Sequence, residues 1–597
     1  MRDFVIHNAN DDQNCDLVIL KVDAYNAFNS ISRKAVLDEV FRRCPEIYPL
    51  VWEAYKDSTP LFIGKNIISS ETGVQQGDPL GSLCFALGID PVIQSLKSRI
   101  NMWYLDDGTL AGPLTQVLED AKTMITKFAA LGLTLNSNKC ELTCLSSKAP
   151  PAMHSQADKL LPNIKLVPRD ELMLLGSAIL EGGLNSSVQK AKGLIENICD
   201  RVKHLDAHTA LFILCHYTSA PRFNYLLRSS PLYLDPALLQ STDVVVRNTL
   251  SQTTNVLIDD TSWKQASLPV RYGGLGVRTT ESLALPSYVA STGKCSTLIN
   301  KIVGYEPSRV PPMHETAVQH LKMKYPSLEA PTGEAAVSQR GWDEAVCKLE
   351  YNNLLQCSSD QIASARLRAA AAPHTGAWLQ ALPSPSLGLH LNADTVRISV
   401  ALRIGAPVAQ PHRCRCGQVV HSNGHHGLSC KNSAGRLPRH SHLNDIVRRS
   451  LLSAGIQSWL EPLGLDRGDG RRPDGLTVSP FSGGKSLCWD ATCSDTFCKS
   501  VLNDSASTPG IAANRAEERK RRFYANIAEN HRFEPLSVET SGVLGASTSK
   551  FVAELGRCIT AITGEKRETA WLRQRLSIAI VTGNAAAVMA TSNHHAP

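Results

Sequence analysis

Three aspartates near the start of the chain could hold divalent cations. Asp23 ends the short apolar run 17–22, and Asp106 and Asp107 follow the apolar segment 103–105. Adjacent acids repel each other unless a cation joins them, and Mg²⁺ is held by carboxylates together with phosphate oxygens and water. Such an arrangement suits nucleotidyl transfer, in which two Mg²⁺ ions stabilise the attacking and leaving oxygens. We expect Asp23 and Asp106 to bind the metals and Asp107 to support them.

A glycine-rich segment, 72–82, lies between these acids in the chain. Its glycines let the backbone approach a ligand closely, and Gln76 offers a donor and an acceptor to a base or sugar. The pair Asp107-Gly108 is typical of a hairpin turn. Taken singly, Asp23 could cap a helix and the two later acids could form an exposed turn. Their order along the chain favours one common site.

A cluster of cysteines and histidines lies further along. Cys414, Cys416, His425 and Cys430 follow the spacing C-x-C-x₈-H-x₄-C, and thiolates and imidazoles at such spacing can close a tetrahedral zinc site. Core cysteines without a metal are the alternative. Other nearby histidines leave the fourth ligand open; they are His421, His426, His440 and His442.

A third group combines two acids with a lysine. Asp474 lies in Pro-Asp-Gly, Asp490 ends the short apolar run 487–489, and Lys520 lies in the basic helical segment 516–524. Acids on paired strands could bind Mg²⁺, and a lysine could orient an attacking water or steady phosphate charge. Considered separately, Pro-Asp-Gly is typical of a turn and the basic run of a solvated helix face.

The N-terminal motifs resemble those of reverse transcriptases. Similar to the family's motifs A to D, in this order, are DAYNAF (23–28), GVQQGDPLGS (73–82), YLDD (104–107) and LGLTLNSNKCEL (131–142). The resemblance implies that Asp23, Asp106 and Asp107 bind Mg²⁺ and that Phe28 rejects a ribose 2′-OH. It also implies nucleotide-binding roles for Gln76, Gly77 and Lys139, and 174–176 resembles the primer-grip hairpin.

One feature departs from the reverse-transcriptase pattern. Family members have a substantial fingers region before motif A, whose basic residues clamp the triphosphate. Here 22 residues precede Asp23, with Arg2 and Lys21 as their cations. We therefore expect the fingers to be mostly absent from this chain.

The C-terminal motifs resemble the PD-(D/E)xK nucleases, and the Cys/His cluster resembles the CCHC knuckle that precedes the nuclease in some non-LTR retrotransposons. On this match the zinc ligands are Cys414, Cys416, His425 and Cys430, and the nuclease acids are Asp474 and Asp490. Thr492 stands where the family usually has its lysine. In the retrotransposon branch the lysine comes from a later helix, which points to Lys520, less firmly to Lys499. Glu517 and Glu539 are possible helpers.

These residues need elements that position them, and the pattern of apolar runs predicts an α/β multidomain protein. The expected parts are a reverse-transcriptase palm (α+β) with the fingers mostly absent (1–145), a primer-grip hairpin and helical thumb (146–290), a helical linker region (291–411), a CCHC zinc knuckle (412–442) and a restriction-like endonuclease domain of PD-(D/E)xK-like α/β fold (443–597).

The composition is that of a folded protein. Of 597 residues, 43% are hydrophobic and 20% charged, and the net charge of +7 permits a nucleic-acid partner without requiring one. The 17 cysteines do not suggest a secreted disulfide scaffold, and neither a signal peptide nor an apolar run of transmembrane length is visible. We expect a soluble intracellular protein with no membrane partner; the family resemblance implies the nucleus.

Together the motifs imply an RNA-directed DNA polymerase of a non-LTR retrotransposon coupled to a DNA-nicking endonuclease. The expected cofactors are Mg²⁺ and Zn²⁺, and the expected partners are an RNA template, target DNA and deoxynucleoside triphosphates. Two alternatives stay open: a fragment that binds nucleic acid without polymerising, and a nuclease whose polymerase is inactive.

Overall fold

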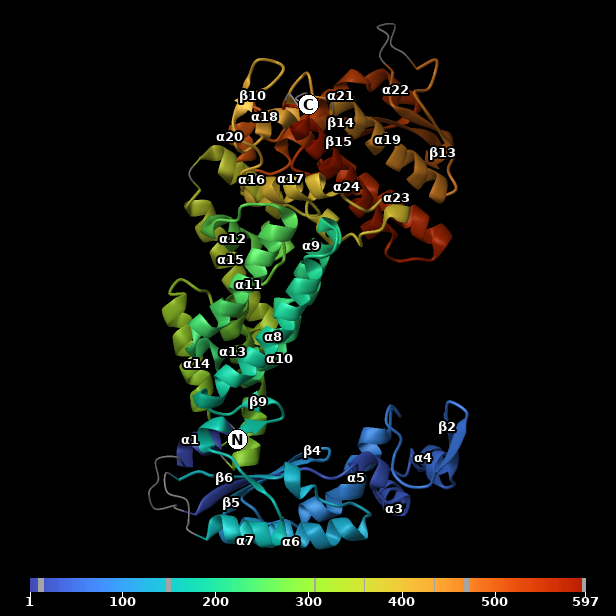
Figure 1. The fold of residues 1–597 in the computed structure, drawn as a ribbon. Coiled ribbons are helices and arrows are strands. Elements are labelled where there is room, and N and C mark those ends of the chain that lie inside the picture. The colour runs from blue at the N-terminus through green and yellow to red at the C-terminus, as the bar shows by residue number, and fades with distance from the viewer. Residues whose placement is uncertain are drawn as a thin grey trace. The chain divides into compact units, whose positions relative to one another are not determined.

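The computed structural model describes all residues except 9–15, 147–151, 305, 307, 359, 434, 466–471 and 593–597. The chain divides into two compact units. The first comprises Met1–Gln189, Arg228–Pro231 and Ser291–Gln319, and the second comprises Lys190–Leu227, Leu232–Ala290 and His320–Pro597. Figure 1 labels the elements of both units.

The first unit is built on a five-stranded sheet in the order β4-β5-β1-β6-β7. β1 lies between β5 and β6 and is antiparallel to both, whereas β6 and β7 are parallel. The strands are β1 (Leu17–Val22), β4 (Ile100–Tyr104), β5 (Asp107–Pro113), β6 (Glu141–Cys144) and β7 (Lys165–Leu166). This mixed α/β organisation agrees with the expected palm.

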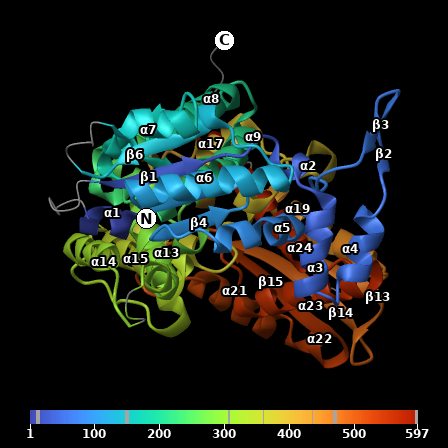
Figure 2. The ribbon, with the colours of Figure 1, turned by 90° about the horizontal axis from the view of Figure 1, so that it is seen from below.

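The central strand β1 is covered on both faces, which explains its almost unbroken apolar sequence. Successive side chains of a strand point to opposite faces. Val18, Leu20 and Val22 therefore pack into one core with residues of the helices α5 (Gly81–Gln94) and α6 (Leu114–Ala130), and Figure 2 shows α6 beside β1. Leu17 and Ile19 pack into a second core on the other face.

The other elements of the first unit surround this sheet. Its helices are α1 (Arg2–Asn8), α2 (Ala27–Ser30), α3 (Arg33–Arg43), α4 (Tyr48–Tyr55), α5 (Gly81–Gln94), α6 (Leu114–Ala130) and α7 (Met153–Leu160). Two hairpins pair only with themselves: β2 (Thr59–Ile63) with β3 (Asn66–Ser70), and β8 (Met173–Leu174) with β9 (Ser177–Ala178). The second of these is the predicted primer-grip hairpin, and its turn residues Leu175 and Gly176 both have positive φ.

The predicted hairpin at the acids is present, but Gly108 does not form its turn. Tyr104 pairs with Asp107, so Leu105 and Asp106 are the turn residues and Gly108 lies within β5. A Cβ atom at Gly108 would lie 2.5 Å from Val22 Cγ2 and 2.6 Å from the Trp103 ring. Glycine is needed there because the strand packs closely against these side chains.

Between β9 and residue 411 the chain is mainly helical. This region consists of α8 (Leu184–Val202), α9 (Ala207–Tyr217), α10 (Ser219–Ser229), α11 (Pro236–Thr254), α12 (Asp260–Ala266), α13 (Thr280–Val303), α14 (Pro312–Lys324), α15 (Gln339–Gln356), α16 (Gln361–Ala371) and α17 (Ala393–Ile404). The helical character expected for 146–290 and 291–411 is present in these segments. The predicted boundary at 290 falls inside α13, where the chain passes from the second unit, which includes Ala290, to the first, which includes Ser291.

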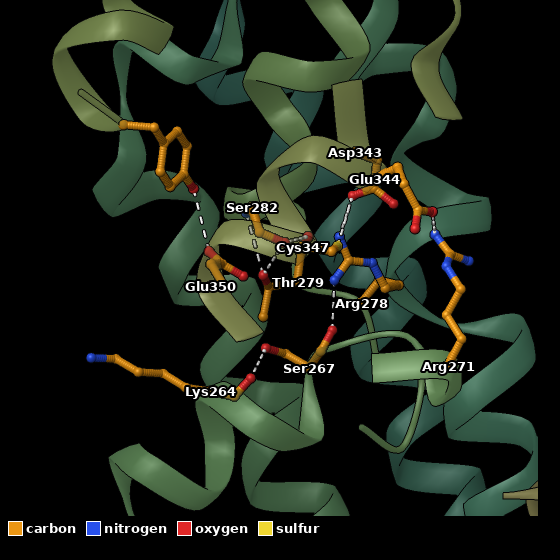
Figure 3. A network of polar contacts seen from close by, with 11 residues as sticks. Lys264, Ser267, Arg271, Arg278, Thr279, Ser282, Asp343, Glu344, Cys347 and Glu350 are labelled. Carbon is orange, nitrogen blue, oxygen red and sulfur yellow. Dashed lines mark hydrogen bonds and ion pairs between the residues drawn. The ribbon is translucent and has the colours of Figure 1, made fainter. Parts of the chain in front are cut away.

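Ion pairs connect the predicted linker region to the predicted thumb. Arg278 pairs with Asp343 on α15 and donates to the Ser267 carbonyl at 2.7 Å, while Arg271 pairs with Glu344 (Figure 3). The charges of Arg278 and Asp343 are both mostly buried, which makes breaking the pair costly. Residues 339–356 are therefore a packed part of the second unit.

The C-terminal part contains a four-stranded sheet in the order β12-β13-β14-β15. β13 and β14 form an antiparallel hairpin, and β15 runs parallel to β14. Its elements are α19 (Arg436–Ser453), β12 (Ser458–Leu460), β13 (Gly475–Ser482), β14 (Lys485–Ser494), α20 (Leu502–Ser505), α21 (Ile511–Phe523), α22 (Ala525–Asn530), β15 (Arg532–Glu539), α23 (Ala546–Thr563) and α24 (Glu568–Met589). The predicted strand–turn–strand and basic helix are present.

The Cys/His segment does not form a separate domain. It consists of β10 (His412–Arg413), β11 (Val419–Val420) and α18 (His425–Ser429). Gly427 and Gly435 lie so close to the backbone of α24 that a Cβ atom would approach it within 2.9 Å and 2.5 Å. The predicted boundary at 442 falls inside α19, because this helix continues from the Cys/His segment to the sheet.

Among the described residues, none of the helices combines the length and the apolar character needed to span a membrane. Every cysteine that the structure describes is a free thiol.

We predict that Gly108→Ala lowers the unfolding free energy by about 1–3 kcal/mol, because the added methyl overpacks the space beside Trp103. Urea unfolding followed by tryptophan fluorescence measures this. Gly193→Ala is the control, since nothing lies within 4 Å of a Cβ atom there and Ala favours a helix. Equal stability of the two variants would contradict the packing argument.

Candidate functional sites

Strand pairing brings the three N-terminal acids together. Val22 pairs with Gly108 across β1 and β5, so Asp23 lies one residue beyond this pair, level with Asp107. Asp106 lies in the adjoining turn between β4 and β5. The structure thus places Asp23, Asp106 and Asp107 at one end of the sheet, as the sequence predicted.

The electrostatics of these acids suit a cation. Burial, followed by the charges of Asp106 and Asp23, raises the pKa of Asp107. Asp23 Oδ1 is buried and accepts no hydrogen bond among the described residues; Lys139 Nζ lies 3.6 Å from it. Mg²⁺ prefers oxygen ligands, and this cluster of acids includes an oxygen that accepts no hydrogen bond. The cluster therefore suits Mg²⁺.

The glycine-rich loop is tied to the segment after Asp23. Gly73 N donates to Ile31 O at 2.8 Å, and Val74 N donates to Phe28 O at 2.7 Å. Gly73 has φ +72, and a Cβ atom there would lie 2.4 Å from the Asn29 backbone. This close approach, which only glycine allows, sets motif B against motif A.

The two predicted binding residues of the loop are exposed, whereas Phe28 is half-buried. Gln76 and Gly77 lie on the surface of the loop, and Gly77 has φ +94. The Phe28 ring stacks on Phe85 of α5, with centroids 4.5 Å apart and the planes at 10°. Phe28 is therefore held rigidly between the loop and the core.

Tyr55 of α4 supports the same loop and was not predicted. Its hydroxyl contacts the Asp78 carboxylate and accepts from Gln75 N at 3.2 Å. Burial, together with the Asp78 contact, raises the pKa of Tyr55 to about 12, so it stays a neutral donor. Tyrosine is common in protein cores, and nothing in the sequence distinguishes Tyr55 from an ordinary core tyrosine.

Motif D joins motif A through backbone contacts. Ala24 forms a β-bridge with Leu135, and Asn136 N donates to Asp23 O at 2.8 Å. Lys139 follows in a single 3₁₀ turn and reaches Asp23. Lys139 therefore lies near the acid of motif A, and its nucleotide-binding role stays a prediction.

Four side chains of the Cys/His segment converge, but His425 is not among them. The ligand atoms of Cys414, Cys416, His426 and Cys430 lie within 4.8 Å of one another. Among the described residues this is the one group of Cys, His, Asp and Glu that meets so closely, and the N-terminal acids do not. His426 Nε2 lies 3.2 Å from Cys416 Sγ. Three cysteine thiols and one histidine imidazole are typical ligands of zinc.

The prediction of His425 is corrected by its position on α18. Consecutive helical residues point about 100° apart, so only one of two adjacent histidines can face the cysteines. The His425 ring instead stacks on Phe497, with centroids 4.0 Å apart. Burial and the charge of Arg366 lower the pKa of His425 to about 4, so it packs as a neutral ring.

Asp474, Asp490 and Lys520 come together in a cleft of about 680 Å³. Asp474 N donates to Trp489 O at 3.0 Å, which sets Asp474 level with Asp490 on the neighbouring strand. Lys520 of α21 forms an ion pair with Asp490. The predicted later-helix lysine thus lies at the acids.

The two acids have different environments. Burial, followed by the charge of Asp474, raises the pKa of Asp490, and Lys520 opposes this shift. Burial would also raise the pKa of Asp474, but hydrogen bonds from His440 and the Ala491 amide outweigh it and lower this pKa. Asp474 is therefore stabilised as an anion by the protein, whereas the anionic form of Asp490 depends on nearby cations such as Lys520.

The other candidates from sequence lie elsewhere. Lys499 is exposed and does not line the cleft. Glu539 accepts from Ala512 N at 3.0 Å, at the start of α21. Glu517 accepts from Thr548 N at 3.0 Å, at the start of α23. Both glutamates satisfy helix N-termini, which is a structural role.

Two further residues contact the acids and were not predicted. His440, one of the histidines considered for zinc, has Nε2 3.0 Å from Asp474 Oδ2. The Tyr524 hydroxyl lies 3.2 Å from Asp490 Oδ1. Tyr524 follows Lys520 by one helical turn, and this spacing is the signal that could have revealed it.

Comparison with known proteins agrees with the geometry of the first unit. Residues 2–179 match the family model described as reverse transcriptase (RNA-dependent DNA polymerase). A relative is the retrotransposable element SLACS 132 kDa protein of Trypanosoma brucei gambiense, 20% identical over 473 residues. The match covers 76% of this chain and 34% of that protein, so the chain spans about a third of its relative's length. Residues 2–179 therefore form a reverse-transcriptase domain, which confirms the resemblance carried by motifs A to D, and the relative is a retrotransposon protein.

Proposed function

We propose that this chain is an RNA-directed DNA polymerase that extends a primer with deoxynucleoside triphosphates on an RNA template. The observation that carries the proposal is the meeting of Asp23, Asp106 and Asp107 at one end of the sheet, with the glycine-rich loop bonded to motif A. When bound, Mg²⁺ would supply charge stabilisation to the attacking and leaving oxygens.

The residues of this chain have distinct parts in the proposed reaction. Asp23 and Asp106 would hold the metals, and Asp107 would add negative charge beside them. Phe28, fixed by its stack on Phe85, would close the space beside the sugar where a 2′-OH would lie. Gln76 and Gly77 would meet the incoming nucleotide, and Lys139 would neutralise phosphate charge near Asp23.

We also propose that the cleft at Asp474, Asp490 and Lys520 nicks target DNA. Two acids from adjoining strands and a lysine on a neighbouring helix supply ligands for Mg²⁺ and a cation for phosphate. Arg472 and Arg519 also line the cleft, which suits an anionic backbone. Extension of the nicked 3′-OH by the polymerase, in the nucleus, belongs to the same proposal.

For the Cys/His segment we propose a structural zinc site with Cys414, Cys416, His426 and Cys430 as ligands. Three thiolates and one imidazole match closed zinc sites that stabilise small folds. The segment packs on α24, so loss of zinc would also disturb that helix.

We expect Asp106→Asn to lower primer extension on an RNA template by more than about 100-fold, because even outer-shell partners of metal ligands account for 10–100-fold. Incorporation of labelled nucleotide with Mg²⁺ measures it. Asp38→Asn is the control, since Asp38 forms only an exposed pair with Lys34. If the wild-type chain binds template–primer but does not extend it, the chain is a binding protein instead.

We expect Asp490→Asn to abolish nicking of supercoiled plasmid while primer extension is retained. The isosteric amide removes the charge that a cation and Lys520 require. Conversion of supercoiled to open-circular DNA is the measurement, with Asp504→Asn as the control because Asp504 pairs with Arg515 outside the cleft. Equal nicking by wild type and Asp490→Asn would reject this site.

We expect about one zinc per chain by metal analysis of the purified protein. Cys430→Ser and His426→Ala should lose it, whereas His425→Ala should retain it, because only His426 approaches the cysteines. Loss of zinc in His425→Ala with retention in His426→Ala would contradict the proposed ligand set.

A further inference from the structure

His440 contacts a candidate nuclease acid without lining the cleft. Its Nε2 lies 3.0 Å from Asp474 Oδ2, and its side chain is 41% exposed, whereas that of Asp474 is 15% exposed. The residues that line the cleft include Asp474 but not His440. Any effect of His440 on the cleft therefore passes through Asp474.

We infer that His440 is a positioning residue that fixes the Asp474 carboxylate for cation binding; the inference rests on the proposed nuclease function. His440 Nε2 lies at hydrogen-bonding distance from Asp474 Oδ2, and a carboxylate oxygen accepts, so the ring nitrogen is the donor. The same oxygen accepts from Ala491 N at 2.6 Å. Two donors on Oδ2 fix the rotation of the carboxylate, and so fix where Oδ1 lies.

Helix α19 determines where the His440 side chain lies. His440 and Asn444 lie four residues apart on α19, on one face of the helix. Asn444 Oδ1 accepts from Trp489 Nε1 at 3.1 Å within the core, and the Asn444 side chain also hydrogen-bonds to Asp474. Helix α19 therefore presents two oriented donors to one acid, while the strand supplies the third through Ala491.

This arrangement has a chemical consequence for cation binding. A carboxylate that rotates freely must lose that freedom when it binds a metal, and an oriented one has already lost it. Partners of metal ligands typically change metal affinity or activity by 10–100-fold. His440 would thus affect cation affinity and nicking together, without contacting DNA.

The helix provides its own control. His442 is two residues along α19 and exposed, so His442→Ala removes an imidazole from the same helix without touching Asp474. His440→Gln keeps an N–H donor at nearly the place of Nε2, whereas His440→Ala removes it. Together these three variants distinguish the effect of losing the hydrogen bond from the effects of losing an imidazole ring or destabilising the helix.

The test titrates Mn²⁺ alone into the full chain by calorimetry, with Asp23→Asn and Asp106→Asn in every sample to remove binding at the polymerase acids. Asp490→Asn identifies the heat that belongs to the cleft. We expect His440→Ala to weaken that binding by about 10–100-fold, His440→Gln to restore most of it, and His442→Ala to leave it unchanged. Nicking, measured without the two polymerase substitutions, should follow the same order.

Two results would overturn the inference: Mn²⁺ binding by His440→Ala equal to wild type, or His440→Gln as weak as His440→Ala. Absence of any Asp490-dependent Mn²⁺ binding would overturn it as well. If the wild-type chain nicks no DNA, the proposed nuclease fails, yet the Mn²⁺ titration still decides whether His440 positions Asp474. Urea unfolding of each variant excludes a general loss of stability.

Discussion

Negative side chains that must lie close together repel one another, and in both candidate sites hydrogen-bonded strands hold them in place. In the first unit Asp23 and Asp107 sit level on β1 and β5. In the second unit Asp474 and Asp490 sit level on the chain leading into β13 and on β14. In each pair burial and the neighbouring charge raise the pKa of one acid, Asp107 or Asp490. The ladder of backbone hydrogen bonds thus sustains an arrangement that the free side chains would avoid.

The two sites compensate this charge differently. In the first unit the cation nearest Asp23 is Lys139, at 3.6 Å and with a mostly exposed side chain. In the second unit Lys520, His440 and Tyr524 all contact the acids directly. The acids of the first unit therefore receive less compensation from the protein, whereas the acids of the cleft are already held by neighbouring side chains.

Close backbone packing supports both arrangements. Gly73 brings the glycine-rich loop against the segment after Asp23, and Gly475 leaves room for the Trp489 ring, which a Cβ atom would approach within 2.0 Å. Trp489 in turn orients Asn444 beside Asp474. Substitution at either glycine would move functional side chains indirectly, because packed interiors transmit displacement.

The sequence by itself determined which strands are buried, the order of the four motifs, the grouping of the three N-terminal acids and the later-helix lysine beside Asp490. Those features depend on local patterns: an apolar run of strand length, an acid at its end, and residues at short fixed spacings. Only the tertiary structure decided that His426 rather than His425 meets the cysteines, that His440 belongs to Asp474, and that Gly108 serves packing rather than a turn. It also placed only residues 320–411 of the predicted linker region in the second unit, where Asp343 pairs with Arg278. The physical reason is that these contacts depend on the direction in which a helix or strand presents each side chain, and on partners tens of residues away, which spacing along the chain does not record.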